Sequence, residues 1–393
     1  GENSRPPRPM PDLSKASDEV LAGLLKDPTL TVRVRAVNRL AERRATAVVQ
    51  VAMDAEPAAP FLQAYGLWVL ERGGVLLQPR VTSLLKHDDR LVRVQALKAL
   101  AERRTWTFEA PLVRERLRDA EPYVRRAAAE ALGLHPAPEN VTPLLELWRK
   151  TAADDTHLIH MARMALRDQL VDETIAQQYA RIVNPEAHRR LASVALGAAT
   201  PSAAALVLEV ARSQGADAAM LRHMIRNLPA QQLPEAYALA TAAASKPPKE
   251  QLPLVRAALQ ACQERGIGAP EVLQTWAGTA ATAALSGTDK GAQQEALKLA
   301  RDLKLAPLFE AIEQLARSAQ AGAEARGAAI DALPQLDRAR AVKTLGPLAA
   351  GAAEPVALRL KAAAALASIP TAEARVQLLE LLKSAPQALG VPI

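Results

Sequence analysis

The clearest candidate for chemistry in this sequence is a possible metal site in the segment 154–160, DDTHLIH. His157 and His160 are three residues apart, so their side chains would share one face of a helix, with Asp154 and Asp155 close by. Zinc accepts imidazole and carboxylate ligands. A spacing of three is more typical of an acidic turn that caps a helix and places histidines in its first turn. We favour the capping interpretation and expect no metal here.

No other grouping of residues suggests catalysis. Cys262 is the only cysteine, so the chain has no CxxC pair and no CxxCH haem-attachment motif. Its Ala/Leu-rich surroundings predict an inert, buried thiol. The sequence contains no GxGxxG segment after a strand, no Walker-type phosphate loop and no GxSxG nucleophile elbow. Serine and histidine are scattered without a readable triad. We therefore expect no catalytic residue, no cofactor and no enzymatic activity.

Five arginines in similar local sequences are the candidates for binding a partner. Each follows an apolar residue, and acidic residues often lie shortly before it. Their guanidinium groups could grip an acidic partner. They could instead pair with the acidic turns of adjacent repeats in an internal ladder, which is the interpretation we favour. The five are Arg33, Arg93, Arg125, Arg326 and Arg359.

Three of these arginines lie in segments that align without gaps and set the period of the chain. The segments begin at Val32, Val92 and Val124, and each continues with Arg, then Ala at the fourth and Leu at the eighth following position. A step of four residues turns about 40° past a full helical circle, so these positions share one helix face. Acidic residues upstream can cap the helix start.

The same frame can be followed along the whole chain and predicts about eleven pairs of helices. It is weakest between 188 and 300. Shorter apolar helices are expected at 19–25, 75–85, 112–117, 141–148 and 376–382. Prolines are expected in the first turns of such helices, where a missing N–H costs little; they are Pro79, Pro111, Pro143, Pro307 and Pro347. The first positions of the frame are Val32, Leu62, Val92, Val124, Leu158, His188, Met220, Leu254, Ala292, Ala325 and Leu358.

The valine–arginine helix and the acidic turn before it resemble HEAT repeats. No run has the period of two that a strand requires, so we expect an all-α, right-handed α-α superhelix, a HEAT-repeat solenoid. One helix pair cannot bury its apolar face alone, and stacked neighbours bury it jointly. The resemblance implies that the second helices, with Arg33, Arg93 and Arg125, line a concave face.

The composition restricts the candidate functions. The chain has 393 residues and a net charge of +7, with a pI of about 9.6 and the basic excess mainly before residue 150. Dedicated nucleic-acid binders usually carry a denser basic stripe and exposed aromatic rings, but only 3% of these residues are aromatic. Packing must rely on Ala, Leu and Val. Trp68, Trp106 and Trp148 could form a binding stripe, but we interpret them as core residues.

The ends of the chain differ from its repeats. Residues 1–17 are rich in proline and arginine, which predicts a semi-extended linker and, as an alternative, a PxxP ligand. The HEAT-repeat array is expected over 18–383, with candidate bends at the prolines near 135–140 and 245–250. Residues 384–393 are expected to form a C-terminal tail or linker. Their apolar character lacks the polar face of a capping repeat, so we expect more protein to follow.

Three stretches are more particular than a generic HEAT repeat, namely 1–14, 67–76 and 156–170. Together they resemble the repeat region of planctomycete-type membrane-bound dehydrogenases, haem-binding multidomain proteins of the PVC type. The resemblance implies a β-propeller before the array, a c-type cytochrome domain after it, and a location in the periplasm or cell envelope. It covers the array only, so neither quinone nor haem chemistry falls on any residue here.

These observations lead to two hypotheses of function. The first is a non-catalytic scaffold or interdomain spacer, whose partners are proteins or the flanking domains of a larger exported dehydrogenase or cytochrome c-type protein. The alternative is a nucleic-acid-binding HEAT-repeat protein that uses the basic N-terminal repeats. Its binding would weaken steeply with salt.

Overall fold

Helices make up the regular structure of the computed structural model, which describes residues 12–180 and 184–384. No strand occurs in these two ranges, so the all-α prediction is confirmed. The chain divides into two compact units, Gly1–Ala198 and Ala199–Ile393. That division coincides with neither candidate bend, and the bends stay predictions. Within the described ranges, no helix combines the length and hydropathy needed to cross a bilayer.

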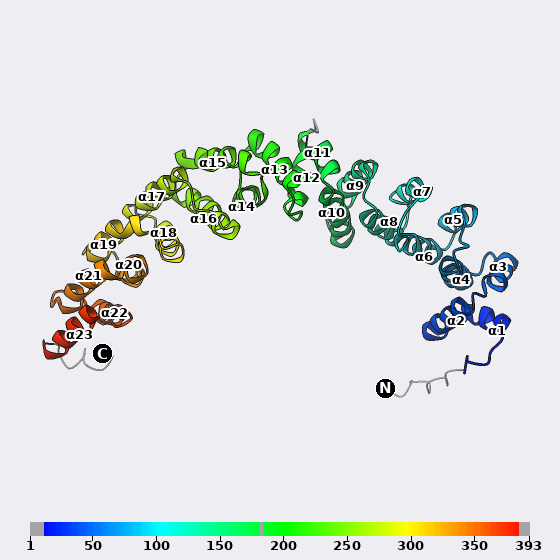
Figure 1. Cartoon of the computed structure of the whole chain (residues 1–393), viewed down its shortest axis with the longest axis horizontal. Coiled ribbons are helices and arrows are strands. Elements are labelled where there is room, and N and C mark those ends of the chain that lie inside the picture. Colours follow the sequence, from blue (N-terminus) through cyan, green and yellow to red (C-terminus); the bar gives the residue numbers. More distant parts are fainter. Residues whose placement is uncertain (1–11, 181–183, 385–393) are drawn as a thin grey trace. The chain divides into compact units, whose positions relative to one another are not determined.

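In the first unit, the even-numbered helices α2 to α12 pack one against the next in a single row, and odd-numbered helices flank that row (Figure 1). The pairing buries one face of each helix against its partner and another against the next repeat. The helices are α1 Asp18–Gly23, α2 Leu30–Glu42, α3 Thr46–Ala55, α4 Pro60–Arg72, α5 Gln78–Leu85, α6 Arg90–Ala101, α7 Glu109–Arg116, α8 Pro122–Leu134, α9 Pro138–Lys150, α10 Thr156–Val171, α11 Glu173–Tyr179 and α12 Pro185–Ala195, with a short 3-10 turn, η1, at Leu24–Lys26.

The second unit repeats this arrangement, with α14 to α22 as the even-numbered row (Figure 1). Three short 3-10 turns, η2 to η4, join its elements. The helices are α13 Pro201–Gln214, α14 Ala218–Asn227, α15 Leu233–Thr241, α16 Pro248–Arg265, α17 Glu271–Ser286, α18 Lys290–Asp302, α19 Phe309–Arg317, α20 Ala323–Leu336, α21 Arg338–Ala350, α22 Val356–Ala367 and α23 Ala372–Ser384; the 3-10 turns are η2 Ala230–Gln232, η3 Ala242–Ser245 and η4 Ala306–Leu308.

The repeat frame read from the sequence matches the even-numbered helices. All eleven predicted first positions lie on separate even-numbered helices, and in nine of them the position is the third residue of the helix. The two exceptions are His188, the fourth residue of α12, and Leu254 in α16. In α14 the predicted Met220 is the third residue but is only half-buried, whereas the next residue, Leu221, is fully buried. In α16 the predicted Leu254 is the seventh residue, because this helix begins one turn earlier than the frame implied.

Acidic residues organise several helix starts, as predicted. The Asp89 carboxylate accepts a hydrogen bond from the Leu91 amide at 2.7 Å and caps α6. The Asp155 carboxylate accepts one from the Leu158 amide at 3.0 Å and caps α10. These caps satisfy amides that have no partner inside their helix.

Two of the five proline predictions are wrong. Pro79, Pro111 and Pro307 lie within the first three residues of their elements, but Pro143 and Pro347 lie inside α9 and α21. The helix α9 begins at Pro138, earlier than the predicted helix at 141–148. The helix α21 begins at Arg338, directly after the capping residue Asp337. An interior proline leaves one carbonyl of the preceding turn without its helical donor.

The core consists mainly of Ala, Leu and Val side chains, as the scarcity of aromatics predicted. Phe309 is the largest of the fully buried side chains among the described residues. Small side chains let helix axes approach closely, so many contacts replace a few large ones. The predicted linker is described only in part. Residues 12–17 precede α1 without helical structure and Leu13 is buried, whereas residues 1–11 and the predicted tail at 385–393 lie outside the described ranges.

A buried histidine in α14 makes the second unit sensitive to acid. His223 is only 7% exposed, and its Nε2 has no hydrogen-bond partner. Burial, with a smaller contribution from the charge of Arg226, lowers the pKa of His223 to about 4. The folded protein therefore holds the neutral imidazole, whereas the unfolded chain takes up a proton near pH 6.5.

We expect His223 to destabilise the second unit as the pH falls. Its contribution is fully favourable above about pH 6.5 and is lost progressively down to about pH 4, roughly 3 kcal/mol in all. Urea unfolding of the full chain at pH 7 and pH 5 measures this change, and His223→Gln should show a smaller loss than the unmodified protein. His157→Gln, at an exposed site on α10, is the control. Equal pH dependence of all three proteins contradicts the prediction.

Candidate functional site

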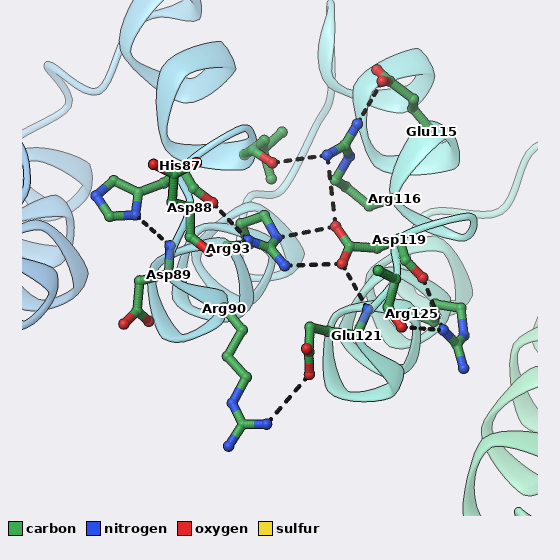
Figure 2. A network of polar contacts seen from close by, with 12 residues as sticks. His87, Asp88, Asp89, Arg90, Arg93, Glu115, Arg116, Asp119, Glu121 and Arg125 are labelled. Carbon is green, nitrogen blue, oxygen red and sulfur yellow. Dashed lines mark hydrogen bonds and ion pairs between the residues drawn. The ribbon is translucent and has the colours of Figure 1, made fainter.

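Arg93 shows how the recurring arginine position of the repeat is used. It is the fourth residue of α6, and its Nε and Nη2 each lie 3.0 Å from a carboxylate oxygen of Asp119. Its Nη1 donates to the carbonyl oxygens of His87 and Asp88, at 2.6 and 2.9 Å (Figure 2). The two side chains are only 11% and 6% exposed. The guanidinium thus joins the turn before its own helix to the turn of the next repeat.

Asp119 is the meeting point of this network. Besides Arg93, its carboxylate accepts from the Glu121 amide at 3.0 Å and lies 3.7 Å from Arg116 (Figure 2). Arg116 in turn donates to the carbonyl of Leu85 at 3.1 Å. Charge-assisted, bidentate bonds of this kind are stronger than neutral ones, and little water competes at this burial. The network fixes α6, α7 and α8 relative to one another.

Arg33 and Arg125 hold their own turns in the same way. Arg125 donates to the carbonyls of Asp119 and Ala120, at 2.8 and 2.9 Å. Arg33 donates to the Asp27 carbonyl at 2.5 Å, and its guanidinium lies 4.1 Å from the ring centre of Phe61 and 4.6 Å from that of Tyr65. Cation–π contact with the next repeat adds to the backbone bond.

Arg326 and Arg359 repeat the pattern in the second unit. Their Nε atoms donate to the carbonyls of Ala316 and Ala349, at 2.9 and 3.1 Å. Arg326 also binds Glu354 of the following repeat at 2.6 Å. All five candidate arginines are therefore the fourth residue of an even-numbered helix and bond to the turn before it or to the last turn of the preceding helix. Each guanidinium thus already has contacts inside the chain. The role of these arginines in binding a partner stays a prediction.

Three glutamines occupy the same position and were missed in the sequence. Gln63 donates to the carbonyls of Met53 and Glu56, at 2.8 and 3.1 Å, and Gln251 to those of Ala244 and Lys246, at 3.1 and 2.6 Å. The third, Gln293, donates to two carbonyls of the turn before α18. In α4 and α18 the sequence could have predicted this role, since the glutamine directly follows the first position of the frame, as the arginines do. In α16 the shifted register hid it.

The three tryptophans singled out in the sequence are half-buried and bonded within the chain. Trp68 donates to Gln95 at 2.9 Å, and Trp106 stacks on His135 with ring centres 3.9 Å apart. The ring of Trp148 lies under the guanidinium groups of two arginines. Neither a purely buried core role nor a continuous exposed stripe describes them.

The acidic turn before α10 has the capping role that we favoured. Asp155 caps the helix, and both His157 and His160 are exposed on it. Among residues 12–180 and 184–384, no three His, Cys, Asp or Glu side chains are arranged to hold a metal ion. Cys262 is fully buried, as predicted, and burial raises the pKa of its thiol. A thiolate is disfavoured there, which suits an inert side chain.

Comparison with known proteins supports the repeat assignment. A family model described as HEAT repeats matches residues 77–167, a stretch that runs from α5 into α10. The helix pairs on either side continue the same alternation, so the chain folds as an all-α HEAT-repeat solenoid. No curated protein matches the sequence.

Two solved structures show a distant likeness. One comes from work on a phosphorylation switch that controls the interaction between cadherin and β-catenin; it is 14% identical, covers 95% of this chain and 98% of its own, and has a TM-score of 0.34. The other is human deoxyhypusine hydroxylase in complex with glycerol, 16% identical over 93% of this chain and 95% of its own, with a TM-score of 0.20. At this level of similarity no site transfers to this chain.

We expect Arg93→Met to loosen α6 and α8 by about 3 kcal/mol, because it strands the buried carboxylate of Asp119 and frees two turn carbonyls. The matched control is Arg90→Met on the same helix. Its ion pair with Glu121 is 60% and 39% exposed, so its loss should cost less than about 1 kcal/mol.

Hydrogen exchange of α6 and α8 in the full chain measures the effect of both variants, since a repeat array opens locally. Faster exchange in Arg93→Met alone is expected. Equal exchange in the two variants would show that the network adds nothing to the stability of this repeat.

Proposed function

We propose that the chain is a non-catalytic scaffold that mediates protein–protein or domain–domain contacts. The observation that carries this proposal is the use of the even-numbered helices. In eight of the eleven the fourth residue bonds inward, while large apolar neighbours such as Leu30, Val34 and Tyr123 stay 55%, 43% and 57% exposed. Aromatic, aliphatic and arginine side chains on a firmly held surface are typical of protein interfaces.

We further propose that the array is a spacer in a larger exported protein of the dehydrogenase and cytochrome c type, located in the periplasm or cell envelope. Support comes from the resemblance of 67–76 and 156–170 to the repeat region of such proteins. The first stretch runs from α4 into the turn before α5, and the second forms most of α10. A helical array of this kind would set the distance between an oxidising site and a haem on other domains.

Nucleic acid is the weaker alternative for the basic N-terminal repeats. A phosphate-binding surface needs cationic side chains that are free to replace counterions. The guanidinium groups of Arg33, Arg93 and Arg125 instead bond to carbonyl, carboxylate or aromatic groups of the chain.

We expect the native protein, captured with an antibody against this segment, to have a mass well above 41.9 kDa and a haem Soret band. Intact-mass measurement and a visible absorption spectrum test this. Cross-linking should then place contacts of the flanking domains on the array. The isolated segment, expressed alone, is the control and should have neither chromophore nor dehydrogenase turnover.

A native mass near 41.9 kDa without a chromophore would remove the spacer proposal. Turnover by the isolated segment would remove the non-catalytic scaffold. Duplex DNA binding that falls steeply between about 50 and 200 mM salt would favour the nucleic-acid alternative.

A further inference from the structure

A groove of about 580 Å³ lies between α10 and α12 in the first unit. One wall is a stripe of α10 that includes His160, Arg163 and Arg167, spaced by three and four residues so that they share a face. The other wall comes from Ser193 on α12 and from Gly197 in the turn that follows this helix. We call this the α10–α12 groove.

The rim of this groove carries positive charge that the surrounding chain does not neutralise. Arg163 is exposed and lies 5.2 Å from the ring centre of Trp148, and within residues 12–180 and 184–384 no carboxylate forms an ion pair with it. Arg189 lies beyond the lining of the groove, one turn before the lining residue Ser193 on α12; it is also exposed and likewise has no ion pair in those ranges. Arg167 is paired with Asp168 at 2.5 Å.

The floor of the groove is apolar. It includes Ile159 and Met164, both half-buried, and the buried Val194. Gly197 lets the side chain of Arg167 lie across this end, because a Cβ on the glycine would be only 3.1 Å from Cδ of Arg167. A cationic rim around an apolar floor suits a ligand that has both carboxylates and an aliphatic side chain.

We propose that the α10–α12 groove binds an acidic segment of a partner protein, with carboxylates on Arg163 and Arg189 and an aliphatic side chain on the floor. The inference rests on the proposed scaffold function and names the chemistry of one partner. A guanidinium without an internal carboxylate gains most from a carboxylate of a partner, since its bidentate bonds match that group.

The surroundings of Trp148 favour a polypeptide over a nucleic acid. Arg163 and Arg190 lie 5.2 and 4.9 Å from its ring centre, so the ring is engaged by cations and does not offer a free face for base stacking. The apolar floor also offers no favourable contact to the charged phosphates of a nucleic-acid backbone.

Fluorescence anisotropy of the full chain with a short labelled peptide of glutamate, with leucine at every fourth position, tests the proposal. We expect binding that weakens with salt and falls at least about tenfold in the double variant Arg163→Glu, Arg189→Glu. A peptide with glutamine in place of glutamate should bind weakly. Arg149→Glu, at an exposed site of α9 outside the groove, is the matched control and should bind normally.

Absence of binding to the unmodified chain would overturn the proposal, as would equal binding by the double variant and the Arg149→Glu control. Tighter binding of an oligothymidylate of equal charge would assign the groove to nucleic acid and also overturn it. Circular dichroism confirms that both variants are folded. These outcomes leave the native mass and absorption spectrum unchanged, so failure here is distinct from failure of the spacer proposal.

Discussion

Every helix pair in this array leaves backbone carbonyls at the turn between its two helices, and these carbonyls need donors. The fourth residue of the second helix supplies them in eight of the eleven even-numbered helices, with arginine in five and glutamine in three. A buried carbonyl without a donor costs about 1–3 kcal/mol, a large penalty for a unit of some thirty residues. The position of this donor therefore constrains the geometry of each repeat.

Arginine and glutamine both supply donors to these carbonyls, but they differ in how many further groups they can bind. A guanidinium has five N–H donors, so Arg93 can bond to its own turn and still hold Asp119 of the next repeat. The carboxamide of Gln251 uses its N–H groups on its turn and accepts from the indole of Trp276 at 2.8 Å. Both couple neighbouring repeats, but only arginine does so through charge, and a solenoid gains its cohesion from such nearest-neighbour contacts.

Much of this fold could be predicted from the sequence, because the same apolar face must recur in each repeat. The frame of Val32, Val92 and Val124 therefore located all eleven even-numbered helices. Register failed at His188 in α12 and at Leu254 in α16, and α16 begins one turn earlier than the frame implied. The interior position of Pro347 was also missed, because a proline predicts a helix start only when nothing else caps the chain earlier.

The candidate site was less predictable than the fold for a physical reason. The repeat frame singles out arginines at the fourth position of a helix, whereas Arg163 is the eighth residue of α10, and burial also distinguishes the two kinds. Arg93 is 11% exposed and paired with a carboxylate, whereas Arg163 is exposed on α10, two repeats further on, and contacts a tryptophan ring in place of an acid. The sequence pattern therefore pointed only to the arginines that bond within the array. The surface available to a partner is therefore made by side chains that the repeat does not need for its own cohesion.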